Sequence, residues 1–203
     1  MAELNSLEAI RAVLGEPRST ALKKIYTELN SRMKEFISRS PLVMMSTVDE
    51  EGWPTISPRG DAPGFVHSPD PATLLIPEYK GNKLAFSLQN LLVNNKVALL
   101  FTLPGVSEVL RVHGTCRILK DPELCQQLAS NSQAALMVIE VSVVNAYFHC
   151  GKAMLRSQAW NNDAWPEPMK VSLGLEVAEN SKQPKEFAAD YDKGVNERYV
   201  TDL

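Results

Sequence analysis

The segment "ISPRGDAPGFV", residues 56–66, combines a charged pair, Arg59 and Asp61, with two prolines and two glycines. An apolar run precedes it, so the segment is expected to lie where a strand ends. A plain turn needs only one proline or glycine, because proline fixes φ and glycine tolerates positive φ. So stiff a segment indicates polar groups that are held in a fixed place.

Other positive side chains accompany turns and strands that could bind an anion. The sequence "YKGNK" holds Lys80 and Lys83 around a glycine, and Arg111 lies on one face of a predicted strand. Backbone N–H groups at glycine turns can cradle a phosphate, and Arg or Lys completes the cradle. Solvated charges at surface turns would give the same pattern, so both interpretations stay open. Neither a Walker lysine motif nor GxGxxG is present, so the sequence gives no local support for an ATP or nicotinamide dinucleotide pocket.

A second candidate group follows in "HCGKAMLRSQAW", residues 149–160. If this segment is helical, His149, Lys152, Arg156 and Trp160 share one face because they are spaced by three, four and four residues. Two cations and an aromatic ring suit an anionic, aromatic ligand. The alternative is an amphipathic helix whose basic face meets water.

Two further chemistries lack support. The histidines and cysteines show neither CxxC nor HxxxH spacing, so we expect no metal site. Ser57 is followed by a proline and is not in a GxSxG elbow, so we expect no Ser–His–Asp nucleophile. No catalytic acid or base can be assigned.

Composition narrows the class of protein. The 203 residues carry a net charge of −3, which argues against general nucleic-acid binding. Three cysteines, an odd number, fit reduced thiols in the cytoplasm. The first residues do not resemble a signal peptide, and no apolar run approaches the roughly 20 residues that span a bilayer. We therefore expect a cytoplasmic protein without membrane or nucleic-acid partners.

Hydrophobic patterns predict an α+β fold. Helices are expected at residues 4–14 and from residue 19 or 20 to residue 39. A hairpin with strands at 42–48 and 53–57 follows. Further strands are expected at 72–78, 96–105, 108–120 and 135–149. Further helices are expected at 84–95, 121–130, 150–160 and 185–203. Because long helices do not alternate with the strands, this order favours an antiparallel barrel with peripheral helices.

Three of these elements carry more detailed predictions. The helix to residue 39 has an apolar stripe, and the helix at 84–95 has one leucine face. In the strand at 108–120, apolar and polar residues alternate between two faces. The apolar stripe comprises Leu22, Ile25, Leu29, Met33 and Phe36, and the leucine face comprises Leu84, Leu88, Leu91 and Leu92. One face of the strand carries Leu110, Val112, Gly114, Cys116 and Ile118, and the other carries Arg111, His113, Thr115 and Arg117.

Four sequence blocks resemble one branch of the pyridoxamine 5′-phosphate oxidase-like flavoproteins, in the same order along the chain. They are "SPRGD", "P-x-Y-x-G-N", "LRVHG" and "FHCGKA-x-x-RS-x-x-W". The resemblance covers roughly residues 20 to 165. It implies an FMN-binding split β-barrel that forms a homodimer, with FMN in the groove between subunits. We expect a single domain, with N-terminal helices over 1–40, the FMN-binding core over 41–165 and a C-terminal tail over 166–203.

The resemblance also implies cofactor-binding roles. The strand with "ISPRGD" would run along the flavin, its stiff prolines pre-organising the backbone groups that meet the ring edge. The "YKGNK" turn corresponds to the segment with which the family binds the phosphate. Arg111 would approach the same site or the partner's flavin. The "FHCGKA-x-x-RS-x-x-W" block would reach FMN from across the dimer. Arg59 or Lys152 would stabilise the negative charge of the reduced ring. The implied FMN-binding residues are Ser57, Pro58, Arg59, Gly60, Asp61, Asn82, Lys83, Arg111, Lys152, Arg156, Ser157 and Trp160.

The activity that follows is an FMN-dependent oxidoreductase acting on a small-molecule substrate or reductant. The family's pyridoxamine phosphate oxidases hold their substrate with a basic, tryptophan-containing C-terminal segment, whereas this chain ends in "GVNERYVTDL". The resemblance therefore does not extend to vitamin B6 oxidation. Alternatives from other classes are a non-catalytic flavin, F420 or haem binder and a dimeric interaction module without a ligand.

Overall fold

The computed structural model describes residues 2–131 and 133–202. Residues 1, 132 and 203, which the expected segments include, lie outside the described residues. Seven strands form one antiparallel sheet in the order β2-β1-β5-β6-β7-β4-β3. The strands are β1 Leu42–Val48, β2 Pro54–Gly60, β3 His67–Asp70, β4 Thr73–Glu78, β5 Lys96–Thr102, β6 Val109–Leu119 and β7 Met137–His149.

The sheet curls around an apolar interior. Val43, Phe101 and Leu110 lie opposite one another on β1, β5 and β6, and all three are fully buried. Strand β6 alternates between buried and exposed residues as its sequence predicts. The α+β fold and the split β-barrel are therefore confirmed.

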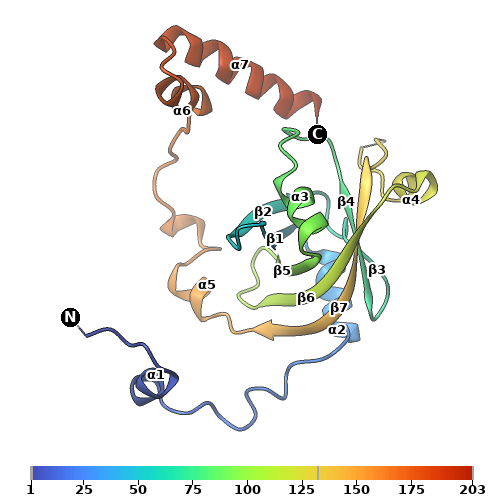
Figure 1. Ribbon diagram of the computed structural model, residues 1–203, viewed down its shortest axis with the longest axis vertical. Coiled ribbons are helices and arrows are strands. Elements are labelled where there is room, and N and C mark those ends of the chain that lie inside the picture. Colours follow the sequence, from blue (N-terminus) through green and yellow to red (C-terminus); the bar gives the residue numbers. More distant parts are fainter. Residues whose placement is uncertain (1, 132, 203) are drawn as a thin grey trace.

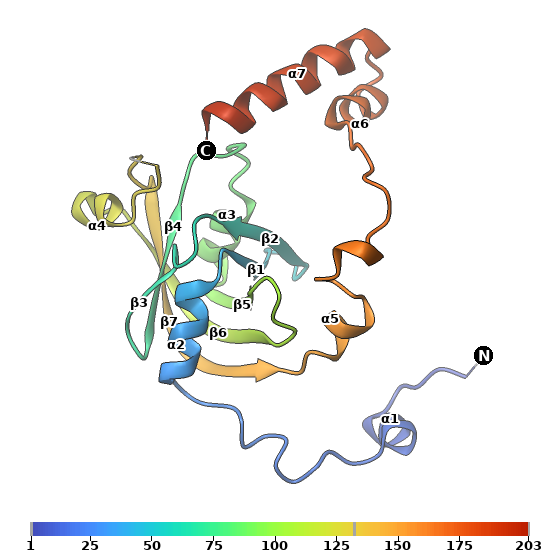
Figure 2. The ribbon, with the colours of Figure 1, turned by 180° about the vertical axis from the view of Figure 1, so that it is seen from behind.

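Helices lie against the barrel and at both ends of the chain. Helix α2 packs its residues Met33, Phe36 and Ile37 into the core, and Phe36 meets Phe148 of β7 edge-on, with 5.4 Å between ring centroids. Figure 2 shows α2 alongside the sheet and α1 well away from it. The helices are α1 Leu7–Leu14, α2 Ser31–Arg39, α3 Phe86–Val93, α4 Pro122–Gln127, α5 Lys152–Arg156, the short 3-10 helix η1 Asn162–Ala164, α6 Leu173–Asn180 and α7 Lys185–Thr201.

The two ends of the chain stand apart from the barrel. Figure 1 shows α1 at one end, and the α6–α7 pair connected to α5 by a long extended segment. Helix α7 runs back so that the C-terminus ends beside the connection between β4 and α3. None of the helices in the described residues is long and apolar enough to cross a membrane.

The long helix predicted from residue 19 or 20 to residue 39 is wrong in its first half. Asn30 caps α2, so the helix begins at Ser31. Upstream, Tyr26 exchanges two backbone hydrogen bonds with Ala146 of β7, at 3.0 and 2.8 Å. This long-range pairing requires extended backbone and overrides the local helical pattern. Of the predicted apolar stripe, Leu22 is consequently 73% exposed.

The other predicted helices were also too long: those at 4–14 and 121–130 are observed as α1 Leu7–Leu14 and α4 Pro122–Gln127, and two more differ at the candidate site. Lys83 and Ala85 have positive φ, so α3 begins only at Phe86 and the predicted leucine face is not formed: Leu84 and Leu92 are exposed. In the segment 149–160 only Lys152–Arg156 is helical, because Gln158 has φ of 51° and ends the turn. The sequence did not predict β3 or α6.

Candidate functional site

Strand β2 carries the first group of predicted site residues, and its pairing with β1 determines which way they point. Ser57 lies opposite Met45 and Arg59 opposite Val43, both fully buried, so these two side chains point to the inside of the barrel. Pro58 lies opposite Met44 and points outward. The prolines of β2 are compatible with its position at one end of the sheet, where the strand has only one neighbour.

The guanidinium of Arg59 forms an ion pair with the carboxylate of Glu78, the last residue of β4. Both side chains are only 17% exposed. Because β2 and β4 are far apart in the order of the sheet, this pair joins the two sides of the curled barrel. The Nε atom of Arg59 is buried and lacks a hydrogen-bond partner among the described residues.

A second polar contact joins β2 to α3. The hydroxyl of Ser57 lies 3.0 Å from the hydroxyl of Ser87, in the first turn of α3. One turn further on, the amide of Asn90 donates to the hydroxyls of Thr47 and Thr55, each at 3.0 Å. Buried polar groups that satisfy one another in this way fix α3 against the β1–β2 hairpin.

The segment 79–85, which we call the β4–α3 loop, is thus attached to β2 at both ends. Glu78 precedes it and pairs with Arg59, and Ser87 follows it and contacts Ser57. Within the loop, the side chain of Asn82 accepts from the backbone N–H of Leu84 at 3.0 Å. The predicted residues Ser57, Arg59, Asn82 and Lys83 are therefore brought into one region.

The loop presents features of an anion site. Lys83 is exposed, and Lys83 and Ala85 both adopt the left-handed conformation, with φ of 62° and 56°. Helix α3 has no side-chain cap at its N-terminus, so its first N–H groups are not satisfied by a cap. Unsatisfied N–H groups at a helix start favour a negative charge, and a nearby lysine strengthens that preference.

Asp61 and Gly60 lie just beyond these residues, at the end of β2. The Asp61 carboxylate accepts from the backbone N–H of Ala62 at 2.6 Å and lines a hollow of about 260 Å³ with Tyr79. The Tyr79 hydroxyl donates to the carbonyl of Leu128 at 2.8 Å. Burial, and secondarily the Asp61 charge, raises the pKa of Tyr79 to about 12, so this phenol stays protonated at neutral pH.

Arg111 is not part of this region within one chain. Arg111 is exposed on β6 and lies opposite Leu100 of β5, which in turn lies opposite Met44 of β1. Since Met44 also lies opposite Pro58, the Arg111 side chain faces outward as Pro58 does. Its guanidinium donates to the Tyr147 hydroxyl of β7 at 3.3 Å. Arg59 and Arg111 therefore point to opposite faces of the same sheet.

The last predicted group lies beyond the end of β7. Lys152 and Arg156 are exposed on the short helix α5, and the Ser157 hydroxyl donates to the Met154 carbonyl at 3.2 Å. The Trp160 indole donates to the carbonyl of Val106 at 2.9 Å, which fixes it to the β5–β6 connection. The four-residue helical face predicted from the spacing is therefore not formed, because the helix ends at Arg156.

Sequence reasoning missed three polar residues that organise the region. Glu78 is the first unspecified position of the "P-x-Y-x-G-N" block, so the block gave it no role. Its pairing with Arg59 depends on how the barrel curls. Ser87 and Asn90 are three residues apart, which places them on one face of a helix. That spacing was the available signal for their contact with β2.

The region fits a phosphate-bearing ligand better than a metal. Among residues 2–131 and 133–202, no three His, Cys, Asp or Glu side chains form a group that could hold a metal ion. The donors are instead the Arg59 guanidinium, the Lys83 ammonium and the start of α3. All three donate hydrogen bonds and carry full or partial positive charge, as a phosphate requires.

Comparison with known proteins gives the family. A family model described as pyridoxamine 5′-phosphate oxidase matches residues 29–150, from the start of α2 to the end of β7. No curated protein sequence matches the chain. The chain thus belongs to the pyridoxamine 5′-phosphate oxidase family. Its assignment to the "SPRGD" branch stays a prediction.

Solved structures that this chain resembles are distant from it in sequence. A variant of HupZ from Group A Streptococcus is 20% identical with a TM-score of 0.50, and the match covers 60% of this chain and 99% of that one. A protein related to general stress protein 26 from Clostridium acetobutylicum is 19% identical, with a TM-score of 0.46 and coverage of 58% and 85%. An FMN-binding protein from Syntrophomonas wolfei is 12% identical, with a TM-score of 0.46 and coverage of 71% and 97%.

Proposed function

We propose that the protein is an FMN-dependent oxidoreductase that works as a homodimer. The observation that carries the proposal is the attachment of the β4–α3 loop to β2 at both ends, through Arg59 with Glu78 and Ser57 with Ser87. This arrangement holds a cationic, N–H-rich loop at a fixed distance from the strand that the family resemblance assigns to the flavin ring. Membership of the pyridoxamine 5′-phosphate oxidase family supports the same cofactor class.

In this proposal the phosphate of FMN is bound by Lys83 and the first N–H groups of α3. The phosphate carries about two negative charges, which the lysine and the helix start complement. Asn82 shapes the loop through its contact with the Leu84 N–H. The half-buried Arg59 lies next to the loop, and its ion pair with Glu78 keeps its side chain in one position.

When bound, FMN supplies two-electron transfer, and the protein supplies binding, orientation and electrostatics. The stiff β2 segment, with Pro58 between Ser57 and Arg59, holds the backbone that would run along the ring. Since prolines limit the conformations of the free chain, little ordering remains for the moment of binding. A cation near the reduced ring stabilises its negative charge, and Arg59 is the half-buried cation on this strand.

The outward face of β2 supports the proposed homodimer. Ile56 is 71% exposed and Trp53, in the hairpin, is 67% exposed. The neighbouring outward residues Pro58 and Met44 are also apolar. Exposed apolar faces of this kind mark interaction surfaces. The family resemblance implies that, in such a homodimer, Arg111 or the α5 cations, which lie apart from Arg59 within one chain, reach the ligand of the other subunit.

The proposal is tested by titrating FMN into cofactor-free protein and then supplying a reductant without oxygen. We expect saturable binding with flavin absorbance near roughly 375 and 450 nm, and loss of the latter band on addition of NADH or NADPH. Lys83→Gln should weaken binding, whereas Lys23→Gln, which removes an exposed lysine of the N-terminal segment, should not. Protein that binds no FMN contradicts the proposal. Bound flavin that neither reductant bleaches would identify a non-catalytic binder instead.

A further inference from the structure

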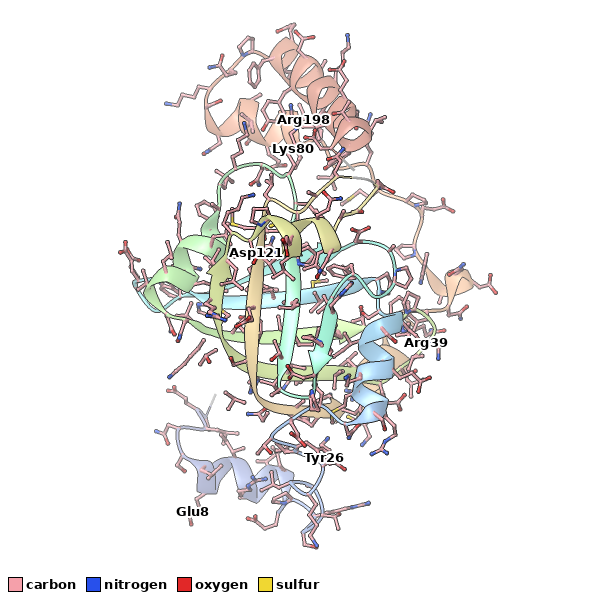
Figure 3. The ribbon with its side chains drawn as sticks, turned by 90° about the vertical axis from the view of Figure 1, so that its right-hand side faces the viewer. Glu8, Tyr26, Arg39, Lys80, Asp121 and Arg198 are labelled. Atoms are coloured by element: carbon pink, nitrogen blue, oxygen red, sulfur yellow. The ribbon has the colours of Figure 1, made fainter. Side chains whose placement is uncertain are left out.

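The end of α7 touches the β4–α3 loop through one ion pair. The ammonium of Lys80, within the loop, lies 2.6 Å from the carboxylate of Asp202. Figure 3 labels Lys80 of the loop and Arg198, one turn before Asp202, in the region where the end of α7 meets the barrel. Among the described residues, the pair of Lys80 and Asp202 is the one salt bridge or hydrogen bond that joins the C-terminal helices to the barrel.

Helices α6 and α7 form a rigid unit, which we call the C-terminal hairpin. Asp192 of α7 accepts from the Ser172 hydroxyl at 2.5 Å and from the Gly174 N–H at 2.7 Å. At Gly174 the helices approach so closely that a Cβ atom would lie 2.2 Å from the carbonyl oxygen of Ala188. Helices α6 and α7 are therefore expected to move together as one rigid body.

The connection between the hairpin and the barrel permits such motion. The Trp160 indole fixes the chain to Val106, but every residue from 161 to 170 is exposed. A segment without buried contacts offers little resistance to local rearrangement. The hairpin is thus linked to the barrel by a loose connection at one end and by Asp202 at the other.

We propose that the C-terminal hairpin is a movable strap, which Asp202 clamps to the β4–α3 loop in the free protein and which a bound phosphate group releases. The inference rests on the proposed function, because it takes the phosphate of FMN, bound at Lys83 in the same loop, as the competitor of the Asp202 carboxylate. The Asp202 carboxylate occupies a cation of the loop and repels a dianion there. Phosphate binding and clamping therefore exclude each other in part, and each weakens the other.

The strength of the clamp suits a reversible contact. The side chains of Lys80 and Asp202 are 56% and 16% exposed, so water and salt reach the ion pair from the Lys80 side. Ion pairs that water reaches typically shift an equilibrium by about two- to fivefold. A ligand with more charge than one carboxylate displaces such a contact without a large loss of its own affinity.

The clamp is tested by the distance between the hairpin and the barrel in the ligand-free protein. Spin labels at Glu123→Cys on α4 and Lys193→Cys on α7, both exposed, are placed in a Cys150→Ser background and diluted with unlabelled chain. Asp202→Asn and Lys80→Gln should each shift the distances to a longer, broader distribution, and the double variant should add nothing. Glu197→Gln, which removes another carboxylate of α7, should leave the distribution unchanged. An unchanged distribution in Asp202→Asn overturns the clamp.

The release is tested by adding FMN to the same labelled protein. FMN should produce the long distribution of Asp202→Asn, whereas riboflavin, which lacks the phosphate, should not. Asp202→Asn should also bind FMN about two- to fivefold more tightly, with riboflavin affinity unchanged. A distribution that FMN leaves unaltered, in protein shown to bind it, overturns the release. Protein that binds no FMN defeats the proposed function and the release with it, while the ligand-free variants still decide the clamp.

Discussion

Arg59 of β2 and Glu78 of β4 form an ion pair between strands that are five positions apart in the sheet order β2-β1-β5-β6-β7-β4-β3. The pair joins the two sides of the barrel and lies directly before the β4–α3 loop. It therefore has two roles, one in stability and one in positioning the candidate phosphate site. Variants that separate these roles are the most informative.

Arg59→Met should destabilise the protein by about 3 kcal/mol, because it leaves the mostly buried Glu78 carboxylate without its partner. The double variant Arg59→Met with Glu78→Leu should recover most of that loss, since no unpaired charge remains. Urea unfolding followed by circular dichroism measures both. FMN binding should stay weak in the double variant; recovered binding would show that Arg59 does not serve the ligand.

Lys83→Gln should weaken FMN binding about tenfold or more, because a charge-assisted hydrogen bond contributes about 1.5–3 kcal/mol. Riboflavin affinity should be the same in Lys83→Gln and the parent protein, because riboflavin has no phosphate for Lys83 to bind. Fluorescence titration of both ligands provides the comparison. Equal losses for the two ligands would place Lys83 at the ring rather than at the phosphate.

Asn90→Leu should cost about 1–2 kcal/mol of unfolding free energy, because Thr47 and Thr55 each lose a hydrogen bond from the Asn90 amide. Asn95→Leu, the same change at an exposed position just after α3, is the matched control and should change little. FMN affinity should fall only for Asn90→Leu, as α3 loosens from the β1–β2 hairpin. Equal stability of the two variants would show that the hydrogen bonds of Asn90 to Thr47 and Thr55 do not fix α3.

Stability should decline at high pH because of Tyr79. Its folded-state pKa is raised from the ordinary 10.0 to about 12, so the neutral phenol is favoured in the fold. The contribution is complete below pH 10 and is lost as the pH rises through about 12. Denaturant midpoints measured across this range should fall less in Tyr79→Phe than in the parent, whereas the exposed Tyr199→Phe should retain the decline.

Ile56→Asp should separate the proposed homodimer without unfolding the chain, since this side chain is 71% exposed on the outward face of β2. Sedimentation equilibrium measures the assembly state. Gln126→Asp on α4, another exposed position, should leave the dimer intact. A parent protein that sediments as a monomer at all concentrations would contradict the homodimer.

Local patterns predicted the elements whose stability is local. Strand β6 alternates as its sequence indicates, and Asp121 caps α4 by accepting from the Leu124 N–H at 3.0 Å. The predicted helix before Ser31 failed because Tyr26 pairs with Ala146, a contact that no local pattern reveals. Propensity is a weak guide where distant backbone competes for the same hydrogen-bonding groups.

The candidate site divides in the same way. Lys83 and Arg59 were visible as cations beside turns, because glycine and proline mark such turns. Glu78 could not be identified as the partner of Arg59, since their contact exists only after the sheet has curled. The inward and outward orientations of Arg59 and Arg111 required the strand register, which depends on the neighbouring strands.

A crystal structure of the protein with FMN would decide whether the β4–α3 loop binds the phosphate. We expect one flavin per chain, with its phosphate in hydrogen-bond contact with Lys83 and the first N–H groups of α3 and its ring along β2. A flavin whose phosphate lies elsewhere, with the β4–α3 loop unchanged and free of ligand, would contradict it.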